Sequence, residues 1–571
     1  MRRESLLVLS FALVLNACSS PGSSTKQDAA AGTGGWGPTG GSATGGLLAN
    51  TGGSGATTGG VSTRTGGEVT PTGGTALPSG GSVTAAGGTV TPVGGSITFG
   101  GTVAATGGNR TGGAATGGAK TGSATATNTA TGILTGTALT TITHTATTTV
   151  TATTTATSTI ADALYVSPTG ADTNPGTKDQ PLLSLSIAVT KAVAGSTIYM
   201  RGGTYWYTTT ITLAASGTKD NPIRIFNYPN EIPVLNYALQ PYASAQRAIL
   251  LSGNYWHLKG LEICYAGDNG IKLEGSHNRI EQCVFHHNGD SGLQLGFAHT
   301  TANPTGELCA YNEIINCDSY LNFDFDNAGS DADGFAAKMH QGKGNVFRGC
   351  RSWHNGDDGW DLFETDWPVE ILNCWTWHNG DRADHEPLYL AKMGKKMSSY
   401  QGNGNGFKLG GNGTGGSSKG THVVKNCVAF DSNFQAKKGF DQNSHSGGVL
   451  VQNCTAFNNG YNYMFESDSG AGTANQFDNN IEFGHKAAMA FEFSAGAILN
   501  NNSWQLTTPA TAADFASLAE TLALAPRQAD GSLPVNDFAR LVETSKLIDK
   551  GKDVGLPFNG AAPDLGAFEC K

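Results

Sequence analysis

Short alternating stretches of apolar and polar residues, rather than helical stripes, fill the chain from Asp162 onward. Apolar runs at Ala163–Val166, Ser196–Met200 and Ile223–Phe226 are bounded by turn residues, a pattern typical of short strands. A helical period of 3.6 residues is scarce before Ala512–Leu524. The pattern therefore predicts an all-β domain over residues 162–571.

Two sequence elements repeat within this domain. The first is a cysteine preceded by Asn, Gln or Gly, found at Cys283, Cys317, Cys350, Cys374, Cys427 and Cys454. The second is Gly-apolar-x-Leu or a close variant, whose glycines are Gly270, Gly292, Gly334, Gly359, Gly406 and Gly439. Where no loop intervenes, a unit is about 22–25 residues long, which suits one coil of a parallel β-helix. Equivalent positions of successive coils would then form columns about 4.8 Å apart.

The cysteine column indicates packing rather than chemistry. Of the 10 cysteines, nine follow Cys18, and no CxxC pair typical of a zinc site is present. We expect an interior stack of small apolar side chains, with a metal or catalytic role as the alternative. If the protein is exported to an oxidising compartment, some of these cysteines could instead form disulfides.

The N-terminal part of the chain has a different composition. Met1–Ala17 has a basic start and a short apolar run, as a secretion signal does. Its end, Leu15-Asn16-Ala17-Cys18, resembles a bacterial lipoprotein box, which implies lipidation of Cys18; ordinary secretion is the alternative. Residues 19–161 are rich in Gly, Thr, Ser and Ala and predict a flexible linker. We therefore expect a signal at 1–18, a linker at 19–161 and a secreted protein held at the outer membrane or cell surface of a bacterium.

The net negative charge of the chain limits the classes of molecule that the folded domain can bind. The formal net charge of the chain is −10, and the acidic groups are concentrated after the linker. Such a domain is unsuited to nucleic acid, whose phosphates require Lys and Arg. An anionic substrate would need a cation between it and the protein.

The residue x of Gly-apolar-x-Leu is expected on the outer face of one sheet, because its neighbours point into the core. This column contains Lys272, Gln294, Ala336, Asp361, Lys408 and Asp441. A charged strip along a β-helix suits a long polymer better than a small molecule.

Acidic residues gather beside this column. Asp333 and Asp357 are 24 residues apart, or one coil, and Asp358 and Asp361 flank the next glycine. Four carboxylates this close repel one another unless a cation lies among them, and hard oxygen ligands favour Ca²⁺. A polar turn ladder without metal is the alternative. Lys408 falls in the next coil beside Asp361, where it could act on a substrate or form a salt bridge.

Several motifs in this region match a known family. Asp331–Gly411 resembles polysaccharide lyase family nine, the pectate lyases with a right-handed parallel β-helix. The matching stretches are Asp333–Lys338 (DGFAAK), Asn355–Leu362 (NGDDGWDL), Gly404–Gly411 (GNGFKLGG) and Lys438–Asn443 (KGFDQN). The resemblance extends more loosely over residues 162–571.

The resemblance implies an activity and roles for individual residues. The implied activity would be calcium-dependent β-elimination of the α-1,4-galacturonan of pectin. Asp333, Asp357, Asp358 and Asp361 would bind the calcium, and Lys408 would be the Brønsted base. We expect a monomer without a nucleic-acid partner. The lysines considered for binding substrate carboxylates are Lys338, Lys392, Lys395, Lys396 and Lys437.

Two other function classes remain open at this point. A β-helix glycoside hydrolase or epimerase would also act on a uronan, and a hydrolase would use paired carboxylic acids. A non-catalytic surface adhesin with calcium-stabilised coils would have no use for Lys408 in the outer column.

Overall fold

The computed structural model describes residues 163–570 apart from 297–302, 412–419, 433–436 and 468–472. The predicted signal, the linker and Cys18 lie outside the described residues. Within the described part, no helix is both long and apolar enough to cross a lipid bilayer.

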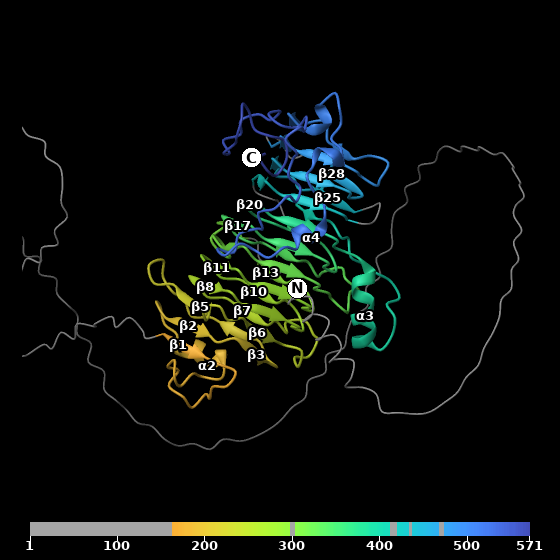
Figure 1. Cartoon of the computed structure of the whole chain (residues 1–571). Helices are drawn as coiled ribbons and strands as arrows, with labels where there is room; N and C mark the ends of the chain where they lie inside the picture. The colour runs from red at the N-terminus through yellow and green to blue at the C-terminus, as the bar shows by residue number, and fades with distance from the viewer. Residues whose placement is uncertain (1–162, 297–302, 412–419, 433–436, 468–472, 571) are drawn as a thin grey trace, which may run out of the picture. The chain divides into compact units, whose positions relative to one another are not determined.

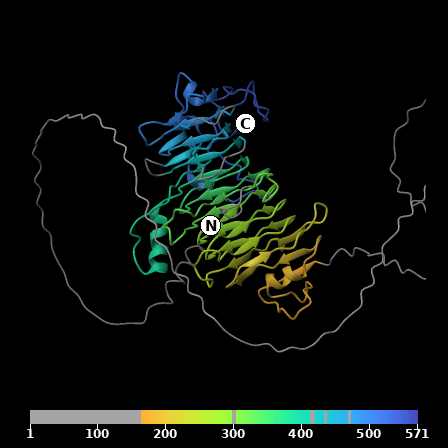
Figure 2. The same cartoon turned by 180° about the vertical axis from the view of Figure 1, so that it is seen from behind.

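The described strands form three parallel sheets of 12, 10 and 10 strands, and from β2 onward consecutive strands of the chain fall in different sheets. This is the parallel β-helix that the repeat predicts, with its coils stacked from the orange end to the blue end (Figures 1 and 2). The longest sheet contains β1 (Leu164–Val166), β2 (Thr197–Met200), β5 (Ile223–Asn227), β8 (Trp256–Lys259), β11 (Arg279–Glu281), β14 (Glu313–Ile315), β17 (Asn345–Arg348), β20 (Val369–Leu372), β23 (His422–Lys425), β26 (Val449–Gln452), β29 (Gln476–Asp478) and β32 (Ile498–Asn500).

We call the second sheet the site sheet, because it carries the Gly-apolar-x-Leu elements. It contains β4 (Ile211–Leu213), β7 (Ile249–Leu251), β10 (Ile271–Leu273), β13 (Leu293–Leu295), β16 (Phe335–Ala337), β19 (Trp360–Asp361), β22 (Phe407–Lys408), β25 (Lys438–Asp441), β28 (Tyr461–Phe465) and β31 (Phe491–Phe493). We call the third the covered sheet, and it contains β3 (Gly203–Trp206), β6 (Pro233–Asn236), β9 (Glu262–Cys264), β12 (Val284–His286), β15 (Asp318–Tyr320), β18 (Arg351–Trp353), β21 (Trp375–Trp377), β24 (Val428–Phe430), β27 (Thr455–Phe457) and β30 (Ile481–Phe483).

Side chains inside the coils stack in columns. On the site sheet the interior column is aromatic, and its ring centroids lie 4.8–5.1 Å apart from Phe335 through Trp360 and Phe407 to Phe440. The six repeat cysteines are fully buried, and every cysteine of the described residues is an unpaired thiol. The interior cysteine stack is therefore confirmed.

The glycines of the repeat are required by close packing. A Cβ atom on Gly334 would lie 1.9 Å from the Ser352 hydroxyl oxygen, and one on Gly359 would lie 2.1 Å from the Thr376 hydroxyl oxygen. Such distances are far below van der Waals contact, so a larger residue would push the turn away from the neighbouring coil. These turns carry the acidic residues of the predicted site.

A ladder of buried asparagines, which the sequence analysis did not predict, fixes the same turns. The Asn322 amide donates to Asn355 Oδ1 at 2.8 Å, and the Asn355 amide donates to Asn379 Oδ1 at 3.0 Å. Because each side-chain amide donates to the carbonyl oxygen of the next asparagine, burying this polar column carries little free-energy penalty, and the hydrogen bonds hold the coils in register. The recurring triplet His-Asn-Gly, as at His354–Gly356 and His378–Gly380, was the available signal.

The helices differ from the sequence expectation. The stretch Ala512–Leu524, where a helical period was noted, contains only a 3₁₀ turn at Ala512–Asp514 and the four-residue α4 (Glu520–Ala523). Its apolar residues pack individually into a hydrophobic cluster instead of forming one helical face. Another 3₁₀ turn spans Ser503–Gln505. Helix α2 (Leu185–Lys191) was not predicted, and it lies at the N-terminal end of the coils.

Residues 381–405 are an insertion that separates Cys374 from the next repeat glycine, Gly406, and they contain α3 (Arg382–Met393), which lies beside the coils in Figures 1 and 2. Its caps explain why it forms. Asp381 accepts a hydrogen bond from Ala383 N, and Gly394 ends the helix in a left-handed conformation with φ 67°.

The β-helix ends at β32, so residues 501–570 are not further coils. This segment packs on the outer face of the covered sheet, where Phe515 and Phe538 join a cluster with Trp375, Trp377 and Phe430. The segment reaches back to the coil of Gln282, whose side-chain amide donates to Asp530 O.

One carboxylate, whose side chain is only 13% exposed, connects this segment to the coils. Asp318 in β15 accepts two hydrogen bonds from Arg351, at 2.9 and 2.7 Å, and two from Arg527, at 3.3 and 2.5 Å. Burial alone would raise the pKa of Asp318, but Arg527 and Arg351 outweigh it and hold that pKa well below its usual value. Asp318, Arg351 and Arg527 thus form a triad in which both arginines are ion-paired with the one carboxylate.

We predict that Asp318→Asn lowers the free energy of unfolding by about 3–5 kcal/mol, because it leaves two buried guanidinium groups without a counter-charge. Urea denaturation would measure the loss. The control is Glu313→Gln, which removes the exposed partner of Arg279 and should change stability little. Equal losses in both variants would contradict the role of the triad.

Candidate active site

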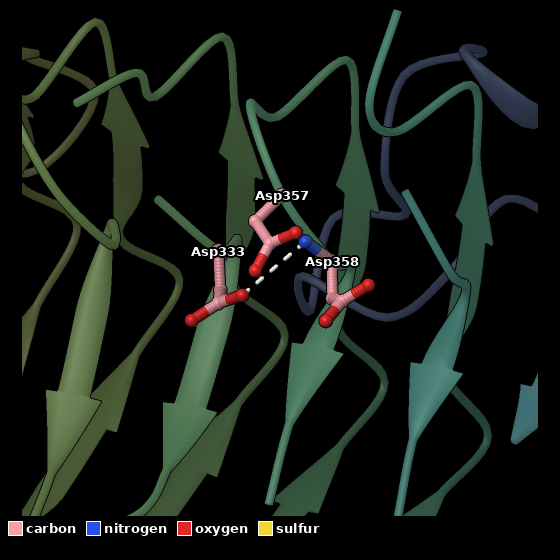
Figure 3. Close-up of side chains that lie close together, drawn as sticks. All are labelled: Asp333, Asp357 and Asp358. Carbon is pink, nitrogen blue, oxygen red and sulfur yellow. Dashed lines mark hydrogen bonds between the residues drawn. The ribbon is translucent and has the colours of Figure 1, made fainter. Parts of the chain in front are cut away.

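Three aspartates meet at the edge of two neighbouring strands of the site sheet. Asp333 precedes β16, and Asp357 and Asp358 precede β19. One carboxylate oxygen from each lies within 4.8 Å of the others (Figure 3). All three residues are at most 1% exposed, so their charges are poorly screened by water.

Backbone groups fix the orientation of the three carboxylates. Asp358 N donates to Asp333 Oδ1 at 3.2 Å, the bond drawn in Figure 3. The other two hydrogen bonds come from the end of the insertion, residues 402–405, which we call the return of the insertion. Asn403 N donates to Asp357 Oδ1 at 2.5 Å, and Asn405 N donates to Asp358 Oδ1 at 2.7 Å. The insertion therefore holds two of the three aspartates in place.

Asp361 lies beside this group rather than within it. It sits in β19, where its Cα is paired with that of Lys408 in β22. Its Oδ1 is 3.5 Å from Lys408 Nζ, and its Oδ2 is 3.3 Å from Lys338 Nζ. The structure thus brings together three of the four predicted metal ligands, and Asp361 connects them to two lysines.

The lysines compensate only part of the negative charge. Lys338 Nζ lies 2.8 Å from Asp333 Oδ2, and Lys408 Nζ lies 3.2 Å from Asp358 Oδ2, an oxygen that accepts no hydrogen bond. Four carboxylates face two ammonium groups, which leaves two formal negative charges in a buried place. A divalent cation would supply the missing charge, and an all-oxygen donor set suits calcium.

The pKa values of these groups reflect the crowding. Burial raises the pKa of Asp358 to about 6, with Asp361 raising it and Lys408 lowering it. Burial, followed by repulsion from neighbouring aspartates, also raises the pKa of Asp333 and Asp357. For Lys408, burial lowers the pKa, but the surrounding aspartates outweigh burial and raise it overall. These shifts show that the buried carboxylates repel one another and that the lysines offset part of this repulsion.

A cavity of about 340 Å³ opens next to Lys408. It is lined by Gly402, Asn403, Asn405, Lys408, Lys437, Lys438, Asp441 and Asn443. Asn405 and Lys438 lie in the matching stretches but were given no role from the sequence, although both directly precede a repeat glycine, as Asp333 and Asp358 do. That shared position was the signal that could have found them.

The outer column is in the predicted register but is not exposed as expected. Lys272, Gln294, Ala336, Asp361 and Asp441 are all buried. Beside Asp357 and Asp358, the covering segment is the return of the insertion, which donates hydrogen bonds to both carboxylates. The outer column is therefore largely buried, with an opening at the cavity next to Lys408, rather than a shallow exposed face.

The lysines considered for substrate contact fall in different places. Lys437 lines the cavity, and its Nζ donates to the Asn379 carbonyl oxygen at 3.0 Å. Lys338 is buried in ion pairs with the aspartates. Lys392 is exposed on α3, 5.7 Å from the centre of the Phe325 ring, and it is not among the cavity-lining residues. Lys395 and Lys396 are exposed beyond the same helix.

Comparisons with known proteins agree with this architecture. A family model described as the Pel9A-like right-handed β-helix region matches residues 164–502. Pectate lyase L of Dickeya chrysanthemi is 37% identical over 414 residues, which are 71% of this chain and 90% of that protein. Pectate lyase L of Paenibacillus polymyxa is 40% identical over 389 residues, covering 65% of this chain and 80% of that protein.

A solved structure gives the same result. The crystal structure of pectate lyase Pel9A superposes with a TM-score of 0.62 at 37% identity, covering 72% of this chain and 96% of that chain. Both the resemblance expected from the motifs and the right-handed β-helix are thereby confirmed. The chain belongs to polysaccharide lyase family nine and is a polysaccharide lyase.

Proposed function

We propose that this chain is a calcium-dependent pectate lyase that cleaves α-1,4-linked galacturonan by β-elimination, with Lys408 as the base. The observation that carries the proposal is the position of Lys408. Its Cα is paired with Asp361, its Nζ lies 3.2 Å from Asp358, and it lines the cavity beside the buried aspartates. The relatives named pectate lyase support the choice of substrate.

The residues of this chain account for the proposed steps. Asp333, Asp357, Asp358 and Asp361 would hold the calcium ion. When bound, that ion would offset the carboxylate charge that raises the pKa of Lys408, and it would stabilise negative charge developing beside a substrate carboxylate. Lys408 would then take the proton from C5 of the uronate. The C4–O4 bond breaks as a C4–C5 double bond forms, and water protonates the departing oxygen.

Substrate contacts follow from the cavity lining. We assign Lys437 to a substrate carboxylate, because it lines the cavity next to Lys408. Lys338 positions Asp333 and Asp361 instead, since its Nζ is used in both ion pairs. Lys392 has no such place in the cavity lining, and we do not retain it as a contact near the cleaved bond.

For location, we propose secretion and attachment through a lipidated Cys18, with residues 19–161 as the spacer. The lipoprotein-like Leu15–Cys18 and the composition of the spacer support this.

We predict that chelation of calcium abolishes activity and that added calcium restores it. Asp358→Ala should remove most activity and weaken calcium binding measured by calorimetry, because it removes a carboxylate from the ligand set. The control is Asp326→Ala at an exposed position of a nearby loop, which should leave both unchanged. Full turnover by metal-free enzyme would refute the calcium requirement.

We predict that Lys408→Ala lowers kcat on polygalacturonate by about 10²–10⁴-fold with little change in calcium affinity, because general-base catalysis is lost. Lys408→Arg should not restore activity, since a guanidinium stays charged. The assay is the absorbance of the unsaturated product, which also separates elimination from hydrolysis. As a control, Lys395→Ala changes an exposed lysine and should be near wild type. If Lys408→Ala also stayed within a few-fold of wild type, the base would be another group.

We predict that a chain beginning at Asp162 keeps its activity on soluble polymer but loses attachment to the cell. All strands and all site residues described above lie after this position. Fractionation of cells followed by an assay of each fraction would measure both properties. Intrinsic turnover lost in a well-folded shortened chain would contradict the assignment of residues 19–161 as a spacer.

A further inference from the structure

The strand column that carries Lys408 contains a second lysine nearer the N-terminal end. In the site sheet, Lys272 of β10 is paired with Gln294, and the column continues through Ala336 and Asp361 to Lys408. Four strand steps separate Lys272 from Lys408. At about 4.8 Å for each step, the two strands are about 19 Å apart.

Lys272 has no directly paired counter-charge among the described residues. It is 6% exposed, and it forms neither a hydrogen bond nor an ion pair within 4 Å among the described residues. By contrast, Lys338, Lys408 and Lys438 each lie within 3.3 Å of an aspartate oxygen. Burial lowers the pKa of Lys272 to about 8. A buried ammonium group without an anionic partner is costly, so an anion supplied from outside would stabilise it.

Two acidic groups near Lys272, Glu274 and Asp290, raise its pKa, but neither forms an ion pair with it within 4 Å. Asp290 and the neighbouring Asp268 have other partners. Asp268 Oδ2 accepts from Ala245 N at 2.5 Å and lies 3.7 Å from Arg247 Nε. Asp290 accepts from Ser291 N at 2.5 Å, and burial raises its pKa to about 7, with Lys338 lowering it and Asp268 raising it. Neither aspartate reaches Lys272. Two cations, Arg247 and Lys272, therefore lie on the N-terminal side of the carboxylate site.

Cations also lie on the other side of that site, where Lys437 and Lys438 line the cavity. Along the stacking direction, the order is thus cations, the carboxylates that would hold calcium, and cations again. A polyuronate carries one carboxylate on every sugar, so a chain lying along this column would meet positive charge at both ends and in the middle. A neutral polymer would gain nothing from this arrangement.

We propose that Lys272 binds a uronate carboxylate several sugars away from the cleaved bond and so favours long chains over short ones. The proposal rests on the proposed function, because it takes the polymer to be a polyuronate lying along the site sheet.

The test compares Lys272→Met with wild type on galacturonan oligomers of increasing length and on polygalacturonate. Methionine keeps the length of the buried side chain without its charge. On the polymer, kcat/KM should fall about ten-fold, mainly through KM, because a hydrogen bond between charged groups is lost. On the shortest oligomers that are cleaved, the variant should equal wild type. Lys272→Arg should recover part of the loss, and Lys425→Met, in β23 of a different sheet, should cause none.

Binding is measured in parallel, so that the result does not depend on catalysis. In a Lys408→Ala background, the retardation caused by polygalacturonate, taken relative to the mobility of the same protein in a gel without polymer, should be smaller for Lys272→Met than for its parent. Equal retardation of the two proteins, or an equal loss of kcat/KM on short and long substrates, would overturn the proposal. If the wild type cleaved no uronan but Lys272 still governed binding, the proposed function would fail and this inference would stand.

Discussion

Crowding of buried carboxylates is the constraint on which the site depends. Asp333, Asp357 and Asp358 present oxygens within 4.8 Å of one another at positions almost closed to solvent. Such a group is stable only if cations compensate it. Two lysines supply part of the compensation, and the same two lysines connect the group to Asp361 and to the cavity. The proposed calcium site and the proposed base Lys408 thus belong to one electrostatic arrangement.

The β-helix makes that arrangement possible because it repeats backbone positions at a fixed spacing. The interior aromatic stack and the asparagine ladder hold β16, β19 and β22 in register. Residues one coil apart in sequence therefore become neighbours without any loop having to fold over them. The insertion adds the one irregular element, since its return segment donates to two of the carboxylates. Covering the strip in this way lowers the local dielectric and strengthens each charge interaction.

Much of this could be predicted from the sequence because the repeat converts spacing into proximity. The separation of Asp333 and Asp357 by one coil placed both at one edge, and Lys408 fell beside Asp361 as expected. The interior cysteine column could be predicted for the same reason, because its cysteines recur at the same position of successive coils. The burial of the outer column was not predictable, because it depends on loops whose path the repeat does not determine. Helix α3 was missed within a polar insertion, although Asp381 and Gly394 mark its ends, and the packing of residues 501–570 on the covered sheet depends on scattered anchors without a period.

The central claim is that the three buried aspartates form a calcium site beside Lys408. Anomalous diffraction from crystals of the enzyme grown with calcium tests it most directly. The account predicts an anomalous peak among Asp333, Asp357 and Asp358, with carboxylate oxygens about 2.3–2.6 Å away. A structure with saturating calcium but no peak there, and with Lys338 and Lys408 still paired to those aspartates, would contradict it.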